Sequence, residues 1–414
     1  MRVRRRMVQT GKKFEASLTG LVLAATFSRL IINTTRRFPY TFAPVLSRGM
    51  GVPLTAVTGL IGLSQITAFM GIFFGPLADR FGYRTMMIGG LGMLILGMFA
   101  GGLLPFYGVI FCSIFLSGLA KSVFDPSLQA YIGQRTPFER RGRIVGIMEV
   151  CWAGSTLVGI PLVAICINRF NWYSPFFLMS GLGLIGWLFL FRLLEKDRSS
   201  ASAHTSPQQS IMNPWKEMLY AWRTLLQKKM NLCVLGSAFC VGASSDNIFV
   251  IYGAWLEQSF GLSVISLGLG TTVIGFAELI GEVLTASSGD RLGLGRSAAL
   301  GLALNVFLCM LLPFFTQTLF FALTGLFLIF LTFEFNIVAT LCLCTELIPG
   351  QRATMMSAFL AMASLGRLIG ALAGGPLWLS GGIKATSFVS TVFGALGLVL
   401  LLFGLMKYQR IHSS

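Results

Sequence analysis

A polar turn between two long apolar runs has the sequence GPLADRFGYR at residues 75–84. Part of this turn recurs later in the chain, because DRFG at 79–82 matches DRLG at 290–293, an offset of 211 residues. A second pattern, Pro-x-x-Arg, occurs at 137–140 and again at 349–352, an offset of 212 residues. Two independent matches at nearly the same offset indicate that the chain consists of two duplicated halves.

The sequence around these turns is strongly apolar. Hydrophobic residues make up 55% of the chain and charged residues 11%, whereas a soluble domain carries about 25% charged residues. An apolar run of about 20 residues can cross a hydrocarbon core, and the backbone inside that core must form helices. The pattern predicts an all-α integral membrane protein with twelve transmembrane helices. They are expected at residues 16–46, 54–78, 84–103, 105–134, 143–168, 174–194, 230–258, 263–288, 296–315, 317–347, 352–379 and 384–408.

The repeat divides these helices into two pseudo-symmetric bundles of six. We expect the first bundle at 1–194, a cytoplasmic linker with a short amphipathic helix at 195–229, and the second bundle at 230–414. The basic N-terminal stretch is similar to the start of a signal peptide. The apolar run after it contains Arg29 and continues past Pro39, so we expect a retained first helix.

Basic residues are distributed unevenly between the two sides of this topology. With the N-terminus inside, 24 of the 32 Lys and Arg residues fall in cytoplasmic segments, whereas the outer loops hold only Arg48, Arg169 and Lys384. Cytoplasmic loops of membrane proteins carry such an excess of Lys and Arg. The sequence therefore predicts a multi-pass protein of the plasma (cell inner) membrane with both termini in the cytoplasm.

Several functional classes are not expected. The net charge of +17 lies in short segments between apolar runs rather than on a basic face, so no nucleic-acid partner is predicted. The eight cysteines lie within apolar runs without metal-site spacing, and the two histidines lie in the linker and at the C-terminus. We therefore expect no metal site, no cofactor and no enzymatic activity. The chain also has no GxxxxGKS/T phosphate loop, which argues against an ATP-driven pump.

The turn at 75–84 resembles the signature loop between helices 2 and 3 of the major facilitator superfamily. The segment PFERRGR at 137–143 is similar to the loop between helices 4 and 5 of the same family. The second copy of the signature is less complete, because Ala286 stands where Gly75 would be expected. The resemblance implies the fold of that superfamily and a transporter, expected here to be a monomer.

In the family, the signature loop forms a cytoplasmic latch that favours the outward-open state. On this chain the matching residues are Gly75, Asp79, Arg80, Gly82, Arg84, Arg143, Asp290 and Arg291. Asp79 lies at a helix end, where it can pair with a nearby arginine. The alternative is that these charges only fix the topology.

Ten of the polar or ionisable residues inside the apolar runs stand out, because an ionisable group there costs at least ~2.5–3.5 kcal/mol and usually faces a cavity or another charge. They are candidates for substrate binding or proton coupling: Arg29, Asn33, Arg36, Lys121, Asp125, Asp246, Glu278, Glu282, Glu334 and Arg367. The first three share one helical face with Tyr40, since they are spaced at i, i+4 and i+7 and Tyr40 at i+11.

Two pairs of ionisable residues leave alternatives open. Lys121 and Asp125, at i and i+4, form either an internal salt bridge or part of a site. Glu278 and Glu282, also at i and i+4, repel each other if both are ionised, so one can hold a proton. The alternatives are that one of them pairs with Arg367 or with a basic group of the first half, or that they bind a cationic substrate.

The leading hypothesis is a secondary active transporter that moves a small solute by alternating access and is coupled to protons, as a symporter or antiporter. Positive charge in the first half and carboxylates in the second suit an anionic or zwitterionic solute. The alternatives are a multidrug-type efflux transporter and a non-transporting sensor or scaffold. The drug–proton antiporter motifs are altered here, because Ile114 replaces an arginine of helix 4 and the helix 5 run at 154–161 contains one extra residue.

Overall fold

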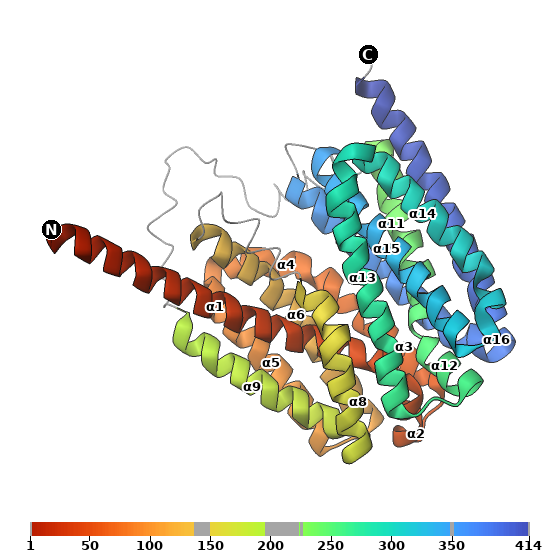
Figure 1. The fold of residues 1–414 in the computed structure, drawn as a ribbon, viewed down its shortest axis with the longest axis horizontal. Helices are drawn as coiled ribbons and strands as arrows, with labels where there is room; N and C mark the ends of the chain where they lie inside the picture. Colours follow the sequence, from red (N-terminus) through yellow and green to blue (C-terminus); the bar gives the residue numbers. More distant parts are fainter. Residues whose placement is uncertain (1, 136–149, 195–222, 224–226, 348–351, 413–414) are drawn as a thin grey trace.

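The computed structural model describes residues 2–135, 150–194, 223, 227–347 and 352–412. The described residues form helices and turns and no strand. The helices form two bundles (Figure 1). The expected amphipathic helix of the linker lies almost entirely outside the described residues, as does the start of the fifth predicted span.

The first bundle contains the red to yellow-green helices of Figure 1. Its elements are α1 (Arg2–Thr41), α2 (Ala43–Met50), α3 (Leu54–Ser64), α4 (Ile66–Phe81), α5 (Tyr83–Leu103), α6 (Tyr107–Arg135), the π-helix η1 (Ser155–Gly159), α8 (Ile160–Arg169) and α9 (Ser174–Leu193). The pairs α1–α2 and α3–α4 each make one crossing, and η1 and α8 belong to another.

The second bundle contains the green to blue helices. Its elements are α11 (Lys229–Phe249), α12 (Tyr252–Phe260), α13 (Val264–Leu292), α14 (Leu294–Leu311), the 3-10 helix η3 (Leu312–Thr316), α15 (Leu319–Leu347) and α16 (Arg352–His412). The long α16 is two crossings joined at Gly382, whose φ of 60° and ψ of −150° are not helical.

Ten spans within the described residues are long and apolar enough to cross a membrane. The two halves of α16 count as one of these, at Thr354–Met406. The helix α1 is not among the ten, and its central part carries Arg29, Arg36 and Arg37. Counting α1 as one crossing and α16 as two gives the twelve crossings that the sequence predicts.

Three predicted spans are interrupted. A break at Phe42 separates α1 from α2, a break at Gln65 separates α3 from α4, and residues 250–251 separate α11 from α12. The first break follows Pro39, which cannot donate a backbone hydrogen bond and disturbs the preceding turn. The helix α1 also begins at Arg2, well before the predicted start at residue 16.

The backbone repeats in the same way as the sequence. Gly82 joins α4 to α5 with φ 90° and ψ 141°, and Gly293 joins α13 to α14 with φ 82° and ψ 135°. Gly51 and Gly261 end α2 and α12 with φ of 66° and 64°. Glycine adopts these positive φ values without the steric cost that a side chain adds. The two halves therefore share these turns and the break that follows α1 and α11, although only the 82/293 pair was visible in the sequence motifs. The break at Gln65 has no counterpart in the continuous α13.

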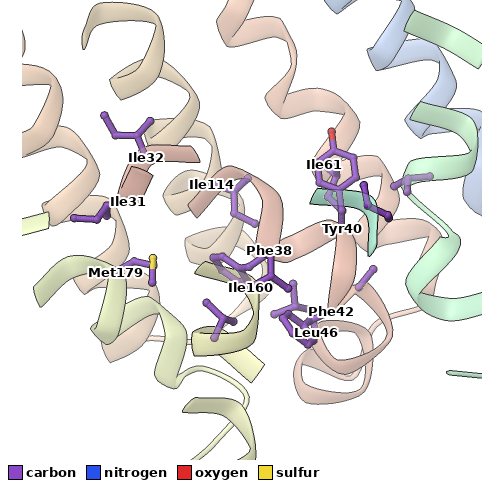
Figure 2. Close-up of a cluster of buried hydrophobic side chains, with 14 of the residues drawn as sticks. Ile31, Ile32, Phe38, Tyr40, Phe42, Leu46, Ile61, Ile114, Ile160 and Met179 are labelled. Carbon is purple, nitrogen blue, oxygen red and sulfur yellow. The ribbon is translucent and has the colours of Figure 1, made fainter. Parts of the chain in front are cut away.

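The helix α1 packs at the centre of the first bundle. Its side chains Ile31, Ile32 and Phe38 are buried with Ile160 and Met179 of neighbouring helices (Figure 2). The ring of Phe38 also meets Phe176 of α9 edge to face, with 5.3 Å between the centroids. This apolar side holds α1 in place, so the arginines on its other faces are directed to other parts of the molecule.

The bundles meet at the end that carries α2 and α12, and their opposite ends, nearer the chain termini, lie further apart (Figure 1). A Cβ added to Gly253 of α12 would overlap the carbonyl oxygen of Thr41. A Cβ added to Gly62 of α3 would lie 3.2 Å from the carbonyl oxygen of Leu368 in α16. This end of the interface is therefore closed by backbone packed against backbone.

Glycines also allow α16 to lie directly on α11. A Cβ on Gly366 would overlap the carbonyl oxygen of Phe239, and one on Gly370 would overlap that of Ala243. Small residues at such spacing allow helices to associate closely in lipid. The Asn247 side chain adds to this contact, donating to the Thr386 carbonyl at 2.9 Å and to the Ser390 hydroxyl at 2.9 Å.

We expect Gly370→Val to destabilise the second bundle, because the added side chain has to displace the backbone of α11. Overpacking of this kind typically costs about 1–3 kcal/mol. Gly92→Val is the matched control, since nothing lies within 4 Å of a Cβ at Gly92. Thermal unfolding of the purified variants in detergent measures the difference. Equal midpoints for the two variants would contradict the close packing of α11 and α16.

Candidate functional site

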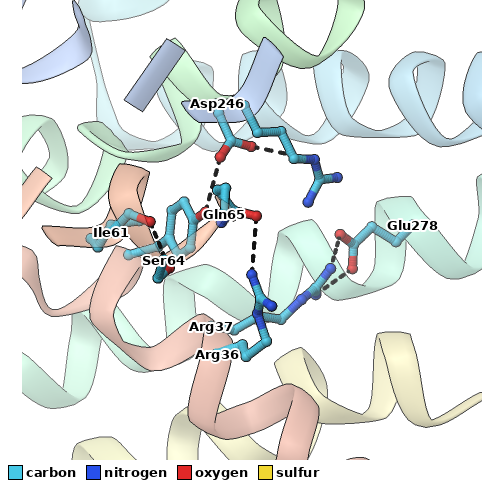
Figure 3. Close-up of polar contacts among 9 residues, drawn as sticks. Arg36, Arg37, Ile61, Ser64, Gln65, Asp246 and Glu278 are labelled. Atoms are coloured by element: carbon cyan, nitrogen blue, oxygen red, sulfur yellow. Dashed lines mark hydrogen bonds and ion pairs between the residues drawn. The ribbon is translucent and has the colours of Figure 1, made fainter. Parts of the chain in front are cut away.

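The polar residues inside the membrane segments gather around α1. One face of α1 presents Arg29, Asn33, Arg36 and Tyr40, and the neighbouring Arg37 points away from that face towards α13 (Figure 3). Contacts from these side chains divide the candidate residues into three groups. One group lies within the first bundle and two connect the first bundle to the second.

The first group surrounds Asp125 of α6. Lys121 donates to Asp125 Oδ2 at 2.7 Å and to Asn33 Oδ1 at 2.7 Å. The Nε atom of Arg29 lies 3.3 Å from Asp125 Oδ1. The predicted i, i+4 salt bridge is therefore present, and two candidates from α1 join it. Two cations share this one carboxylate.

The second group is a relay between the bundles. Arg36 Nη2 donates to Gln65 Oε1 at 3.0 Å, and Gln65 Nε2 donates to the Tyr40 hydroxyl at 2.6 Å. The Tyr40 hydroxyl in turn donates to Asp246 Oδ2 of α11 at 2.9 Å (Figure 3). The Nε atom of Arg367, in α16, lies 3.8 Å from Asp246 Oδ1. Here too, two cations stand against one carboxylate.

The third group is a buried ion pair between Arg37 of α1 and Glu278 of α13 (Figure 3). Arg37 donates from Nη1 and Nη2 to the two carboxylate oxygens at 2.7 and 2.6 Å. Only 6% and 3% of the two side chains are exposed. The guanidinium also lies 4.0 Å from the Trp152 ring centroid and donates to the Thr156 hydroxyl. Bidentate pairing of this type is strong and geometrically specific.

Thr156 reaches Arg37 from a π-helical turn. The segment Ser155–Gly159 forms η1, within the run that has one more residue than the antiporter motif. A π turn accommodates an additional residue in a helix and often occurs at functional sites. Gly159, at the end of this turn, leaves room for the Thr34 side chain of α1. The extra residue is therefore absorbed within the helix beside the Arg37–Glu278 pair.

Glu334 of α15 lies against α13, close to the same pair. A Cβ on Gly281, three residues after Glu278, would lie 2.9 Å from the Cβ of Glu334. Glu334 is 6% exposed and, within the described part of the chain, makes no hydrogen bond or ion pair. Glu282 is half-buried and has a partner. Since Arg37 holds both oxygens of Glu278, Glu334 is the buried carboxyl of this region without a partner.

The latch residues are only partly described. Gly82 has the positive φ given above, and Arg80 is exposed with its guanidinium 5.8 Å from the ring of Phe81. Arg84 donates to the Phe191 carbonyl at 3.0 Å. Gly75, the side chains of Asp79, Asp290 and Arg291, and all of Arg143 lie outside the described residues. The latch therefore stays a prediction.

Three residues of these groups were not predicted from the sequence: Arg37, Gln65 and Thr156. Arg37 lies off the face shared by Arg29, Arg36 and Tyr40, so the periodicity that selected that face excluded it. Gln65 was detectable as an isolated amide within the apolar run 54–78. The alternative in which Glu278 pairs with a base of the first half is the arrangement that the structure has.

The family model of the Major Facilitator Superfamily matches the chain twice, at residues 22–237 and 234–412. The chain is 25% identical over 347 residues to the uncharacterized MFS-type transporter YceJ of Bacillus subtilis (strain 168), which covers 84% of each chain. It is 23% identical to the uncharacterized MFS-type transporter YwfA of the same strain, over 96% of this chain and 93% of the relative.

A solved structure supports the fold alone. The chain superposes on a mutant of the peptide transporter POT in complex with alafosfalin with a TM-score of 0.75 at 15% identity. The match covers 95% of this chain and 94% of the other. The two-bundle arrangement predicted from the repeat is thus the arrangement of this transporter fold.

We expect removal of either partner of the Arg37–Glu278 pair to be strongly destabilising, because the other charge is then buried and uncompensated. Loss of one partner of such a pair costs about 3–5 kcal/mol. Arg37→Gln and Glu278→Gln, measured by thermal unfolding, should each lower the midpoint, and the double variant should be less destabilised than the sum.

The control is the pair of Arg48 and Glu257 at the closed end, 2.6 Å apart, in which 62% of the arginine side chain is exposed. An exposed pair contributes about 0–1 kcal/mol, so Arg48→Gln should have little effect. Equal effects of Arg37→Gln and Arg48→Gln would show that the buried pair does not hold the bundles together.

Proposed function

Because this chain belongs to the Major Facilitator Superfamily and is a membrane transporter, we propose that it is a secondary active transporter coupled to protons. It moves a small anionic or zwitterionic solute by alternating access. The observation that carries the proposal is the unpartnered carboxyl of Glu334 beside the Arg37–Glu278 pair. Ionisable groups of this kind inside a membrane commonly mark a path for protons or substrate.

The physical argument starts from the cost of a buried charge. An ionised carboxylate without a partner in a low-dielectric site is costly, and a bound proton removes that cost. Glu278 avoids it by pairing with Arg37, whereas Glu334 makes no ion pair with any of the described residues. The proposal is that Glu334 holds the proton in the conformation described here.

Alternating access then links this proton to movement of the bundles. Arg37 belongs to the first bundle and Glu278 to the second, so separating them at this point breaks the pair. A proton that reaches Glu278 compensates its lost partner. Protonation and the bundle arrangement are therefore thermodynamically linked, which is the requirement for coupling. Glu278 and Glu334 replace the predicted Glu278–Glu282 couple as the proton-carrying residues.

The orientation follows from the distribution of basic residues. We place both termini and the 195–229 linker in the cytoplasm, and the chain in the plasma membrane, on the excess of Lys and Arg in those segments. The closed end at α2 and α12 then faces outward. In this proposal the conformation described here is open towards the cytoplasm, and the latch around Asp79 and Arg84 acts when that side closes.

Two other functions make different predictions. A multidrug-type efflux transporter would move a cationic dye such as ethidium. A non-transporting sensor or scaffold would show no flux and would bind a partner through the linker. The two arginines around the single carboxylate of Asp246 favour a negatively charged solute over a cationic one.

Glu334→Gln is expected to abolish solute-driven proton movement and to leave solute exchange intact, because glutamine cannot carry a proton but preserves the shape of the site. Proteoliposomes containing a pH-sensitive dye receive benzenesulfonate, phosphate, alanyl-alanine or ethidium, and the internal pH is followed. Counterflow of a labelled solute measures exchange.

Glu346→Gln is the matched control, since Glu346 is an exposed carboxylate on the same helix. Its proton movement should equal that of the unmodified protein. If Glu334→Gln retains full proton movement, the assignment of the proton to Glu334 is wrong. If no solute moves at all, the sensor or scaffold replaces the transporter mechanism proposed here.

A further inference from the structure

We propose that Arg36 and Arg367 together bind the anionic group of the transported solute, which makes the substrate an organic anion rather than a zwitterion or cation. The inference rests on the proposed transport function and specifies its substrate class. Arg36 comes from α1 of the first bundle and Arg367 from α16 of the second. The anion would therefore be held by both bundles.

Both guanidinium groups have N–H donors that make no hydrogen bond to the described residues. A guanidinium carries five N–H donors. Arg36 uses one of its groups, Nη2, for a hydrogen bond to Gln65. The ion pair of Arg367 joins Nε to Asp246 at 3.8 Å, which exceeds hydrogen-bond distance. No other hydrogen bond or ion pair of these two side chains exists within the described residues.

Both side chains are also accessible. Arg36 is half-buried, and 26% of the Arg367 side chain is exposed. By contrast, the Arg37 guanidinium is enclosed by Glu278, Thr156 and Trp152. Unused donors that a solute can reach are thus present at Arg36 and Arg367, whereas Arg37 belongs to the closed ion pair.

The charges around this face of α1 do not balance. Among the described residues, Arg36 and Arg367 stand against the single carboxylate of Asp246, an excess of one positive charge in this group. An excess of positive charge in a low-dielectric interior is unfavourable. A bound anion would offset it, and two arginines suit the planar, bidentate geometry of carboxylate and phosphate.

The carboxylates near this face are not available for an amino group. Asp246 accepts a hydrogen bond from Tyr40 through Oδ2, and with 1% of its side chain exposed its other oxygen is out of reach of a solute. Asp125 accepts a hydrogen bond from Lys121 through Oδ2, and its Oδ1 is buried with Arg29 Nε 3.3 Å away. A zwitterion or cation therefore lacks a free acidic partner here. This decides between the two solute classes that the distribution of charge in the sequence left open.

Gln65, Tyr40 and Asp246 act as positioning residues for the two arginines. Gln65 holds Arg36, Asp246 lies beside Arg367, and Tyr40 connects them. The Tyr40 ring is also stacked on Phe249 at 4.5 Å between centroids, which restricts its movement. Because the relay crosses the interface, the distance between the arginines depends on the arrangement of the bundles, and so does anion binding.

The test uses three probes of similar shape and different charge: benzoate, benzamide and benzylammonium. Purified full-length protein in detergent is titrated with each at millimolar concentration, and both the unfolding midpoint and equilibrium binding are measured. Only benzoate should bind. Arg36→Gln and Arg367→Gln should each weaken benzoate binding roughly ten- to hundredfold, the usual effect of losing a charge-assisted hydrogen bond.

Arg48→Gln is the control and should bind benzoate like the unmodified protein, because Arg48 lies at the closed end with its own partner Glu257. Arg36→Lys and Arg367→Lys retain the charge, so they distinguish weaker binding from a failure to fold. They should fold normally and bind benzoate more weakly than the unmodified protein, because lysine cannot form the bidentate contact.

Three results would overturn the inference: equal binding of benzamide or benzylammonium, unchanged benzoate binding in the Arg367 variants, or no binding of benzoate, benzenesulfonate and phosphate. The proposed function can fail independently. Glu334→Gln should still bind benzoate, so benzoate binding without solute-driven proton movement rejects only the coupling. Proton-coupled flux of alanyl-alanine or ethidium without any anion binding rejects only the two-arginine site.

Discussion

The buried ion pair of Arg37 and Glu278 is the interaction on which the arrangement of the two bundles depends. It joins residues 241 positions apart in the chain, at 2.6 and 2.7 Å, with almost no exposure. In such a site neither charge can be left alone without a large free-energy cost. In the proposed mechanism, movement of the bundles at this point therefore accompanies protonation of Glu278, and the nearby Glu334 is the carboxyl that exchanges the proton.

Two arginines on different faces of α1 have different roles. Arg37 is enclosed with Glu278 and Trp152 and has no donor directed to solvent, which suits a structural and coupling role. Arg36, the preceding residue, belongs to the face on which cations outnumber carboxylates, which suits recognition of an anion. Consecutive residues of a helix lie about 100° apart, so one helix can serve both sides of the interface.

The architecture was predictable because it depends on local patterns. The lengths of the apolar runs predicted the membrane spans, and the DRFG and DRLG turns predicted the repeat. The i, i+4 spacing predicted the pair of Lys121 and Asp125. The partners of Arg37 and Arg367 were not predictable, since the rotation and depth of packed helices decide them. The sequence drew attention to Glu278 and Glu282 as neighbours on one helix, whereas the partner of Glu278 lies in the other half of the chain. Likewise, the extra residue at 154–161 could be recognised in the sequence, but the π-helical turn that accommodates it could not.

The central claim is that the Arg37–Glu278 pair links protonation to the closure of the bundles at α2 and α12. Spin labels at Val52 and Ser263, in a cysteine-free background, report the distance across this end by pulsed electron resonance. Glu278→Gln, which mimics the protonated side chain, should lengthen the distance at neutral pH, and acidification should lengthen it in the unmodified protein. An unchanged short distance in Glu278→Gln at every pH would contradict the claim.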